Sequence, residues 1–250
     1  MKAIIRDLLH EFKVYSTIGM KRIRLGSPND GGYVVLQDLL PICPRLYSFG
    51  IGDNMDFEED FLQHVPGARG ELFDPYITDL PKQVPRAFFT CDGLSTLLKL
   101  RPPENSFLKV DVEGAEWEFF RQGSCWEKIN SFSQIVIELH LFHATAPVGL
   151  SPYFTKVYQT HADRLNEKFF STCWFTMASL NAKFRLIHFH VNNSLPMMEL
   201  DGVKFPPLVE LTFARQDLVP EAVPLNFFPQ FPELDRSNKL DRPNYYFIGA

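Results

Sequence analysis

The chain has 250 residues, of which 45% are hydrophobic and 22% charged, so it is long enough to bury a core without disulfides or metals. Lys and Arg total 25 against 30 Asp and Glu, and the net charge of -5 lacks the basic excess of a phosphate-tracking surface. We therefore expect one main domain and no nucleic-acid partner. The small basic cluster of Lys21, Arg22 and Arg24 is interpreted as a solvated face.

Cysteine usage and hydropathy indicate where the protein works. Cys43, Cys91, Cys125 and Cys173 stand singly, which excludes a zinc knuckle and a disulfide framework and fits a reducing compartment. Charges interrupt the first twelve residues, unlike a secretion signal, and no apolar run approaches the roughly 18 residues that span a bilayer. We expect a soluble, cytoplasmic protein without a membrane partner. The 24 phenylalanines predict an aromatic core, with an apolar substrate pocket as the less favoured alternative.

The first elements are a helix and a hairpin. Five apolar residues share one helical face: Ile4, Ile5, Leu8, Leu9 and Phe12. The β-type runs Lys21–Leu25 and Tyr33–Leu36 enclose residues 27–32, which are dense in turn formers. This spacing predicts a hairpin.

From residue 46 short apolar runs alternate with helical periods. The expected strands are Leu46–Phe49, Glu71–Phe73, Ala87–Phe89, Phe107–Val110 and Ile135–Leu139. Helical spacing links Phe57, Phe61 and Val65, and again Leu94, Leu97 and Leu98. Right-handed crossovers place such strands in one parallel sheet with helices on both faces.

The second half of the chain is predicted to contain one more helix and two more strands. These are a helix at Tyr153–Lys168 and strands at Arg185–His190 and Leu208–Phe213. The tail from Val219 is rich in proline, so we expect it to be irregular and to lie over the domain or be ordered by a partner.

The first strand of the alternation ends in the run Phe49–Asn54, FGIGDN. Its glycines let the backbone turn sharply and approach a ligand. Met55 replaces the third glycine of the dinucleotide pattern, so the run fits either a nucleotide-type site or a plain turn. Asp74 ends the next strand, where a ribose diol needs a two-acceptor partner; the alternative is a turn residue ahead of Pro75.

Charge helps to separate the possible ribose-bearing ligands. The helix after the glycines begins with the acids Asp53, Asp56, Glu58 and Glu59, in the field that a pyrophosphate would occupy. This disfavours a nicotinamide dinucleotide. S-adenosylmethionine (SAM) has no phosphate and carries an ammonium and a sulfonium, so it suits acidic strand ends. The acids can also simply complement the helix dipole, with no ligand at all.

The third and fourth strands also end in acids. Asp92 is placed to accept a hydrogen bond from an adenine amino group or to cap the helix that begins at Leu94. Asp111 and Glu113 point the same way if the strand continues to Glu113, and Gly114 permits a tight entry into the next helix. Buried unpaired carboxylates are costly, so this pair implies a cationic or hydrogen-bonding partner.

Four runs, in this order and at these intervals, resemble the FkbM-type branch of the class I SAM-dependent methyltransferases: FGIGDN, FDP, KVDVEGAEWEF and IVIELH. NDGGYVVL and IHFHVNN resemble flanking segments of methyltransferase-like relatives, and the resemblance covers roughly residues 22–215. It implies a Rossmann-like α/β fold with a mostly parallel seven-stranded sheet. Residues 1–45 are then an N-terminal extension, 46–215 the methyltransferase domain, and 216–250 a Pro-rich C-terminal extension.

The resemblance also implies roles for individual residues around SAM. Gly50, Gly52 and Asp53 would line its methionine part, with Asn54 completing the run. Asp74 would hold the ribose, Asp92 would lie near the adenine, and Asp111 would sit beside the transferring methyl group.

Methyl transfer needs positioning, plus a base when the acceptor is a hydroxyl. His140, after the fifth strand, is our expected base, with Asp111 or Glu138 orienting it or acting as the base; the alternative is a structural histidine. The resemblance thus implies methyl transfer, and together with this candidate base it leads us to expect O-methylation of a hydroxyl on a small molecule, glycan or natural product.

Polar residues of a later strand are the expected substrate contacts. His188 and His190 alternate onto one face, and we assign His190, Asn192 and Asn193 to the acceptor. With Asp111, Glu138 and His140 they would alternatively form a divalent-metal site for a sugar diol, but no ligand spacing demands it, so we assign no metal. An NAD-dependent oxidoreductase, a metal-dependent hydrolase and a non-catalytic binding module stay as rival functions.

Overall fold

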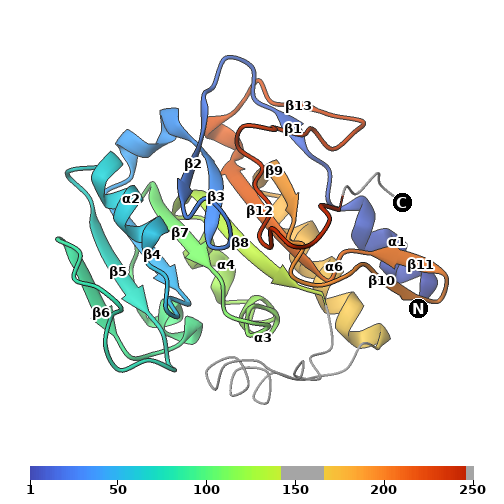
Figure 1. The fold of residues 1–250 in the computed structure, drawn as a ribbon, viewed down its shortest axis with the longest axis horizontal. Helices are drawn as coiled ribbons and strands as arrows, with labels where there is room; N and C mark the ends of the chain where they lie inside the picture. Colours follow the sequence, from blue (N-terminus) through green and yellow to red (C-terminus); the bar gives the residue numbers. More distant parts are fainter. Residues whose placement is uncertain (142–165, 246–250) are drawn as a thin grey trace.

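The protein folds around one central sheet, shown by a computed structural model that describes residues 1–141 and 166–245 (Figure 1). The order of its seven strands is β6-β5-β4-β7-β8-β12-β9. Their bounds are β4 Arg45–Phe49, β5 Arg69–Phe73, β6 Ala87–Thr90, β7 Ser106–Val110, β8 Phe132–His140, β9 Phe184–Val191 and β12 Leu208–Arg215.

The strand pairing confirms the predicted Rossmann-like α/β fold. β4 pairs in parallel with both β5 and β7, and β6 and β8 extend the parallel sheet on either side. β12 is antiparallel to both β8 and β9, so the sheet is mostly parallel. The chain crosses from one side of β4 to the other between β6 and β7, which makes the β4–β7 boundary the place where the strand order reverses.

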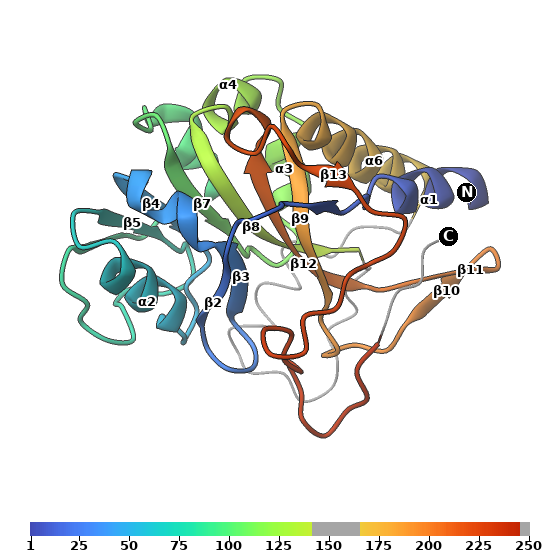
Figure 2. The same ribbon diagram turned by 90° about the horizontal axis from the view of Figure 1, so that it is seen from above.

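Helices cover both faces of the sheet, as predicted (Figure 2). Within the described parts of the chain, one face carries the helices α1 Lys2–His10, α3 Glu116–Phe120, α4 Cys125–Ile129 and α6 Glu167–Asn181. The other face carries α2 Asp56–His64 and the predicted hairpin of β2 Arg22–Gly26 and β3 Gly32–Leu36. Each face encloses its own hydrophobic cluster, so the sheet is buried on both sides.

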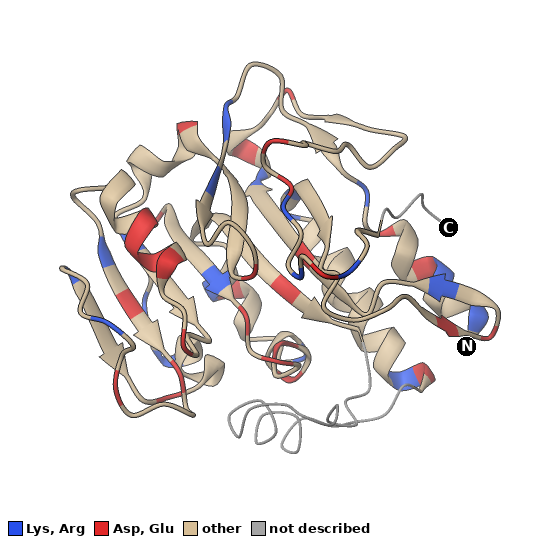
Figure 3. Cartoon of the chain, viewed as in Figure 1, with Lys and Arg blue, Asp and Glu red and all other residues tan. Residues whose placement is uncertain are grey.

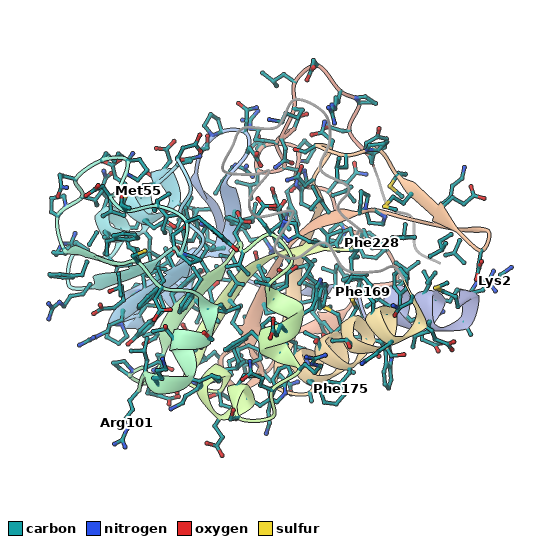
Figure 4. All side chains as sticks on the ribbon, turned by 90° about the horizontal axis from the view of Figure 1, so that it is seen from below. Lys2, Met55, Arg101, Phe169, Phe175 and Phe228 are labelled. Atoms are coloured by element: carbon teal, nitrogen blue, oxygen red, sulfur yellow. The ribbon has the colours of Figure 1, made fainter. Side chains whose placement is uncertain are left out.

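Phenylalanine fills both clusters, and the predicted aromatic core is confirmed. Among the residues that the structure describes, eleven of the twelve largest fully buried side chains are phenylalanines. Met55 lies on the α2 side of the sheet and Phe169 on the α6 side (Figure 4). Phe169 packs against Trp117 of α3, with ring centroids 5.9 Å apart.

Several elements differ from the prediction. The helix expected from Leu94 is a 3-10 helix, η2 Leu94–Lys99, and further 3-10 turns are η1 Gln37–Ile42 and η3 Gln216–Leu218. The helix predicted at Tyr153–Lys168 lies almost wholly outside the described residues, whereas α6, which begins at Glu167, was not expected. Also not predicted are the short strand pairs β1 Tyr15–Ser16 with β13 Val223–Pro224, and β10 Met198–Leu200 with β11 Val203–Phe205.

The C-terminal segment, which we define as residues 225–245, has no regular structure, in agreement with its proline content. It lies over β9 and the β2–β3 hairpin. Arg24 donates hydrogen bonds to the carbonyls of Ser27, Asn29 and Leu234, and the Arg22 guanidinium stacks over the Phe231 ring. The solvated face predicted for these arginines was therefore wrong, because their planar guanidinium groups hold a turn and the C-terminal segment.

Candidate functional site

Two neighbouring cavities lie beyond the carboxyl ends of the parallel strands, at the point where the strand order reverses. The smaller cavity, about 250 Å³, lies between the ends of β4, β5 and β6 and the helix α3. The larger cavity, about 400 Å³, lies between the ends of β4, β7 and β8 and the loop after β9. Gly50 and Glu113 line both cavities. Ligands of open α/β sheets bind at this position.

Gly50 makes the sharp turn between the cavities possible. Its φ is +84°, and a Cβ built there would lie 1.6 Å from the backbone oxygen of Asp111. The close approach follows from the ladder, since Asp111 donates its backbone N–H to the oxygen of Phe49 at 2.9 Å. Only glycine fits this position, as the glycine run predicted.

Asp74 holds the glycine loop from the end of β5. Its fully buried carboxylate accepts hydrogen bonds from the backbone N–H groups of Ile51 and Gly52, both at 3.0 Å, and from Tyr76 at 2.7 Å. The last bond is the turn predicted as the alternative for this residue. The same carboxylate lines the smaller cavity, so both interpretations of Asp74 fit the geometry.

The other residues of the glycine run line the larger cavity. Gly52, exposed Asp53 and Asn54 all border it. The Asn54 side chain accepts a hydrogen bond from the N–H of Asp56 at the start of α2. The acidic start of α2 is visible in Figure 3. Lys82 pairs with Asp56 and Glu59, and Lys109 pairs with Glu58, so lysines offset much of the negative charge expected beside the glycine loop.

Asp92 lies beside the smaller cavity rather than in its wall. It accepts a hydrogen bond from the Gly93 N–H at 2.8 Å, and Gly93 and Leu94 provide the cavity surface. The N-cap residue of η2 is Gly93 and no side chain caps this helix, so the capping alternative for Asp92 was wrong, because Asp92 lies one residue too early.

The fourth strand does not continue to Glu113. Asp111 and Glu113 therefore do not share a direction through strand alternation, which was the expectation for a longer strand. β7 ends at Val110, and the backbone turns through positive φ values at Glu113, +53°, and Gly114, +101°, before α3 begins. The two carboxylates nevertheless converge on the larger cavity, because the turn replaces strand alternation.

His140 lies between carboxylates on both sides of its ring. Nδ1 is 3.1 Å from Glu116 Oε1, and Nε2 is 3.2 Å from Glu113 Oε2. Carboxylates only accept hydrogen bonds, so both ring nitrogens donate and the imidazole is protonated. Burial would lower the pKa of His140, but Glu116 and Glu113 outweigh it and raise the pKa well above 6.5. This geometry favours the structural-histidine alternative over the predicted base.

Glu138 is the second acid at the end of β8 and faces the larger cavity. Its Oε1 accepts a hydrogen bond from Asn192 Nδ2 at 2.5 Å, and its Oε2 lies 3.8 Å from His140 Nε2. Burial and the neighbouring Asp111 raise the pKa of Glu138 well above its ordinary value. Asp111 accepts a further hydrogen bond from the Tyr33 hydroxyl of the hairpin at 3.1 Å.

The residues predicted to contact substrate do not lie together. Asn192 lines the larger cavity, but Asn193 instead donates to the C-terminal segment, including Ser237 Oγ at 2.9 Å. His188 and His190 share one face, as predicted, yet their partners are Asp235 and Glu210. His190 borders a separate cavity beneath the C-terminal segment. These two histidines are therefore not part of the acidic cluster proposed as a metal-site alternative.

Lys109 is a site residue that the sequence analysis did not single out. Its buried ammonium donates to the oxygen of Gly50 at 2.9 Å and lies 3.2 Å from Glu58 of α2, while it lines the larger cavity. Burial alone would lower the pKa of Lys109, but Glu58 and Asp111 raise it. The available signal was a lysine inside an otherwise apolar buried strand, since such a charge needs a partner.

The donor atoms of Asp111, Glu113 and His140 lie within 4.8 Å of one another, which marks this group among the described residues as a possible metal-binding cluster. Asp30 of the hairpin turn is a further acid at the same cavity and was not predicted.

Comparison with protein-family models matches residues 89–167 to the methyltransferase FkbM domain. These residues, under half of the chain, are similar to the methyltransferase FkbM domain. The FkbM match runs from within β6 to the start of α6 and includes Asp111, Glu113, Glu138 and His140. It confirms the family that the sequence runs resembled.

Solved structures of methyltransferases are only distantly similar. The mitomycin 7-O-methyltransferase MmcR is 13% identical, with 72% of this chain and 52% of that chain covered and a TM-score of 0.38. Human N-acetylserotonin methyltransferase in complex with SAM is 13% identical, with 72% and 50% covered and a TM-score of 0.33. This chain spans about half the length of either protein. Both TM-scores lie below 0.5. The Rossmann-like fold therefore follows from the strand order of the central sheet and not from these neighbours.

No curated protein sequence matches the chain. Among the described residues, no helix combines the length and apolar character that a bilayer crossing requires.

Proposed function

We propose that the FkbM domain binds SAM across the two cavities and transfers its methyl group to an acceptor in the larger one. The observation that carries this proposal is the shared border at Gly50 and Glu113. A ligand whose adenosyl part occupies the smaller cavity brings its sulfonium to this border, next to open space for an acceptor. The family match supports the reaction class.

The smaller cavity suits an adenosyl group. Leu94, Val112 and Phe119 offer apolar surface to an adenine ring, and Asp74 offers a carboxylate to a ribose diol. We assign Asp92 a supporting role through Gly93, whose backbone it holds.

The glycine loop suits the methionine part of SAM. Gly50, Gly52, Asp53 and Asn54 lie on the side of the larger cavity, where carboxylates attract an ammonium and a sulfonium. The carboxylates on this side of the larger cavity would repel the negative charge of a pyrophosphate. The rival ligand, a nicotinamide dinucleotide, therefore fits this loop less well.

The acceptor is proposed to be a hydroxyl of a small molecule, sugar or natural product. Asp111 and Glu138 face the larger cavity and are the carboxylates able to take the hydroxyl proton, while Asn192 holds Glu138 in place. We now assign His140 a positioning role, since its two ring nitrogens both donate to carboxylates. Four free cysteines support a reducing compartment such as the cytoplasm.

Thermal unfolding with SAM tests the proposal. The protein is freed of metals with a chelator and unfolded alone, with SAM, and with NAD(H). At a hundredfold excess over its Kd, SAM adds ~2.7 kcal/mol, which for a chain of this size raises Tm by roughly 5–10 °C. NAD(H) is expected to give no shift.

Asp74→Asn supplies the site-specific control, because it keeps the shape and removes the charge that a ribose diol would meet. We expect it to lose most of the SAM shift, whereas Asp79→Asn, an exposed acid on the same loop, keeps it. A shift with NAD(H) instead of SAM, or an Asp74→Asn shift equal to that of the unmodified protein, would show that SAM does not bind as proposed.

A further inference from the structure

We propose that Asp111, Glu113 and His140 form a binding site for one divalent transition-metal ion, of which Mn²⁺ is the preferred probe, in the wall of the larger cavity. The role of this ion toward an acceptor rests on the proposed methyl transfer, whereas its binding does not. The site takes two carboxylate oxygens and one imidazole nitrogen from the turn after β7 and the end of β8.

The spacing of the three donor atoms suits a shared ion. They lie within 4.8 Å of one another, and His140 Nε2 is 3.2 Å from Glu113 Oε2. Ligands bound at about 2.0–2.2 Å to one ion are separated by roughly 3 to 4.4 Å. Small side-chain movements around an ion are therefore enough to complete the geometry.

His140 is oriented in the way that metal-bound histidines are. Glu116 is fully buried and holds the ring through Nδ1 at 3.1 Å, and the same oxygen accepts the His140 backbone N–H at 2.9 Å. Trp117 Nε1 also donates to the His140 carbonyl at 2.8 Å. A carboxylate on the second nitrogen fixes the tautomer and leaves Nε2 toward the ion. On binding, the ion replaces the proton that Nε2 gives to Glu113, and this proton goes to solvent.

The charge around the cavity independently indicates a cation. Five carboxylates border it: Asp30, Asp53, Asp111, Glu113 and Glu138. Lys109 and His140 are the two buried cations nearby. Lys109 pairs with Glu58 and His140 pairs with Glu116, and these two carboxylates do not line the cavity. Lys239 and Arg242 also line the cavity, but these are two cations against five carboxylates, so the wall keeps an excess negative charge that a bound divalent metal would offset.

Three protein ligands leave coordination positions open toward the cavity. Open positions are typical of metal sites that bind a substrate oxygen. Carboxylates favour Mg²⁺ and Mn²⁺ while imidazole favours Zn²⁺ and its neighbours, and Mn²⁺ is compatible with both donor types. An ion here would bind the acceptor hydroxyl and ease its loss of a proton to Glu138, which is not a ligand of the ion.

Metal titration tests the inference without an activity assay. The full chain is freed of metals and titrated with Mn²⁺, with binding followed by calorimetry and by the paramagnetic resonance of free Mn²⁺. We expect one ion per chain. Glu113→Gln is expected to weaken binding at least tenfold, while Glu127→Gln, which removes an exposed carboxylate of α4, leaves it unchanged.

Asp111→Asn is the second ligand variant, used with circular dichroism so that loss of fold is recognised. Failure of the unmodified protein to bind Mn²⁺ or Zn²⁺, or equal binding by the two folded ligand variants, overturns the inference. A separate SAM titration of the metal-free protein keeps the proposals apart. SAM binding without metal binding overturns only the metal site, and metal binding without SAM binding overturns only the cofactor assignment.

Discussion

At the scale of single residues, the site depends on groups that tolerate few substitutions. Gly50 admits the Asp111 carbonyl where any other residue carries a Cβ. Lys109 connects the glycine loop to Glu58, so one ammonium joins β7, β4 and α2. Lys109 is buried, and Gly50 lies directly against the Asp111 backbone, so neither position has room to relax around a different side chain.

Gly50→Ala is expected to destabilise the fold by at least ~3 kcal/mol, because a positive φ costs about 1–3 kcal/mol and the methyl group overlaps the Asp111 carbonyl. Urea unfolding measures the change. Gly67→Ala is the matched control, because its φ is ordinary and nothing lies within 4 Å of the added Cβ. A stable Gly50→Ala protein with unchanged SAM binding would contradict this account of the loop.

Lys109→Met is expected to cost about 3–5 kcal/mol, because it leaves the fully buried Glu58 without its cation. Adding Glu58→Gln should restore part of that loss. Lys82→Met removes an exposed pairing with Asp56 and Glu59 and should change stability by about 0–1 kcal/mol. Equal effects of the two lysine substitutions, measured by urea unfolding, would show that Lys109 is not a buried structural cation.

At the scale of elements, the C-terminal segment is joined to the β9–β12 strand pair by buried ionisable side chains. His190 faces Glu210 directly across the two strands, at 3.0 Å, and Glu210 also accepts a hydrogen bond from Asn238 at 2.5 Å. His188 contacts Asp235 at 2.7 Å. Whether the C-terminal segment stays in place therefore depends on the protonation states of His188, His190 and Glu210.

The His190–Glu210 pair predicts a pH-dependent contribution to stability. Burial would lower the pKa of His190, but Glu210 raises it above 6.5, and burial would raise the pKa of Glu210, but His190 lowers it below 4.5. Protonated His190 thus stabilises the fold below about pH 6.5, and this contribution is lost as the pH rises through its raised pKa. Ionised Glu210 contributes above about pH 4.5 and is lost at lower pH.

The measurement is the difference in unfolding free energy between the unmodified protein and His190→Gln, from pH 4 to pH 9. We expect the largest advantage of the histidine between about pH 4.5 and 6.5 and a decline above that range. Using the difference separates His190 from His188, whose pKa burial lowers. An advantage that grows from pH 6.5 to 9 would contradict the assigned ion pair.

At the scale of the whole molecule, one sheet separates two hydrophobic clusters that must fold together. Phe61 belongs to the cluster on the α2 face, while Trp117 and Trp126 lie with the cluster on the other face. Both clusters pack on the same strands, since β4 contributes Leu46 to one and Phe49 to the other.

Phe61→Ala is expected to lower the free energy of unfolding by ~3–5 kcal/mol. Tryptophan fluorescence, which reports the opposite face, should still change at the same denaturant concentration as circular dichroism. Phe227→Ala, at a residue 64% exposed, is the control with little effect. Separate transitions by the two probes would show that the faces unfold independently.

Sequence periodicity was sufficient for the parallel core. The strand ends predicted at Phe49, Phe73, Val110 and Leu139 lie within one residue of the observed ends, and the predicted starts lie one to three residues from the observed ones, because buried strands need apolar runs and crossover helices need their own period. Periodicity failed for η2, where the same apolar spacing folds as a 3-10 helix. The division into residues 1–45, 46–215 and 216–250 stays a prediction.

By itself the sequence determined the α/β sheet, the glycine turn, the acids at the strand ends and the family, since these depend on local pattern and on residue type at fixed intervals. Only the tertiary structure decided which charges meet. Lys109 with Glu58, His140 with Glu116, and Arg24 with Leu234 of the C-terminal segment join residues 24 to 210 positions apart. Sequence spacing carries no information on such contacts, because strand order and crossovers bring these groups together.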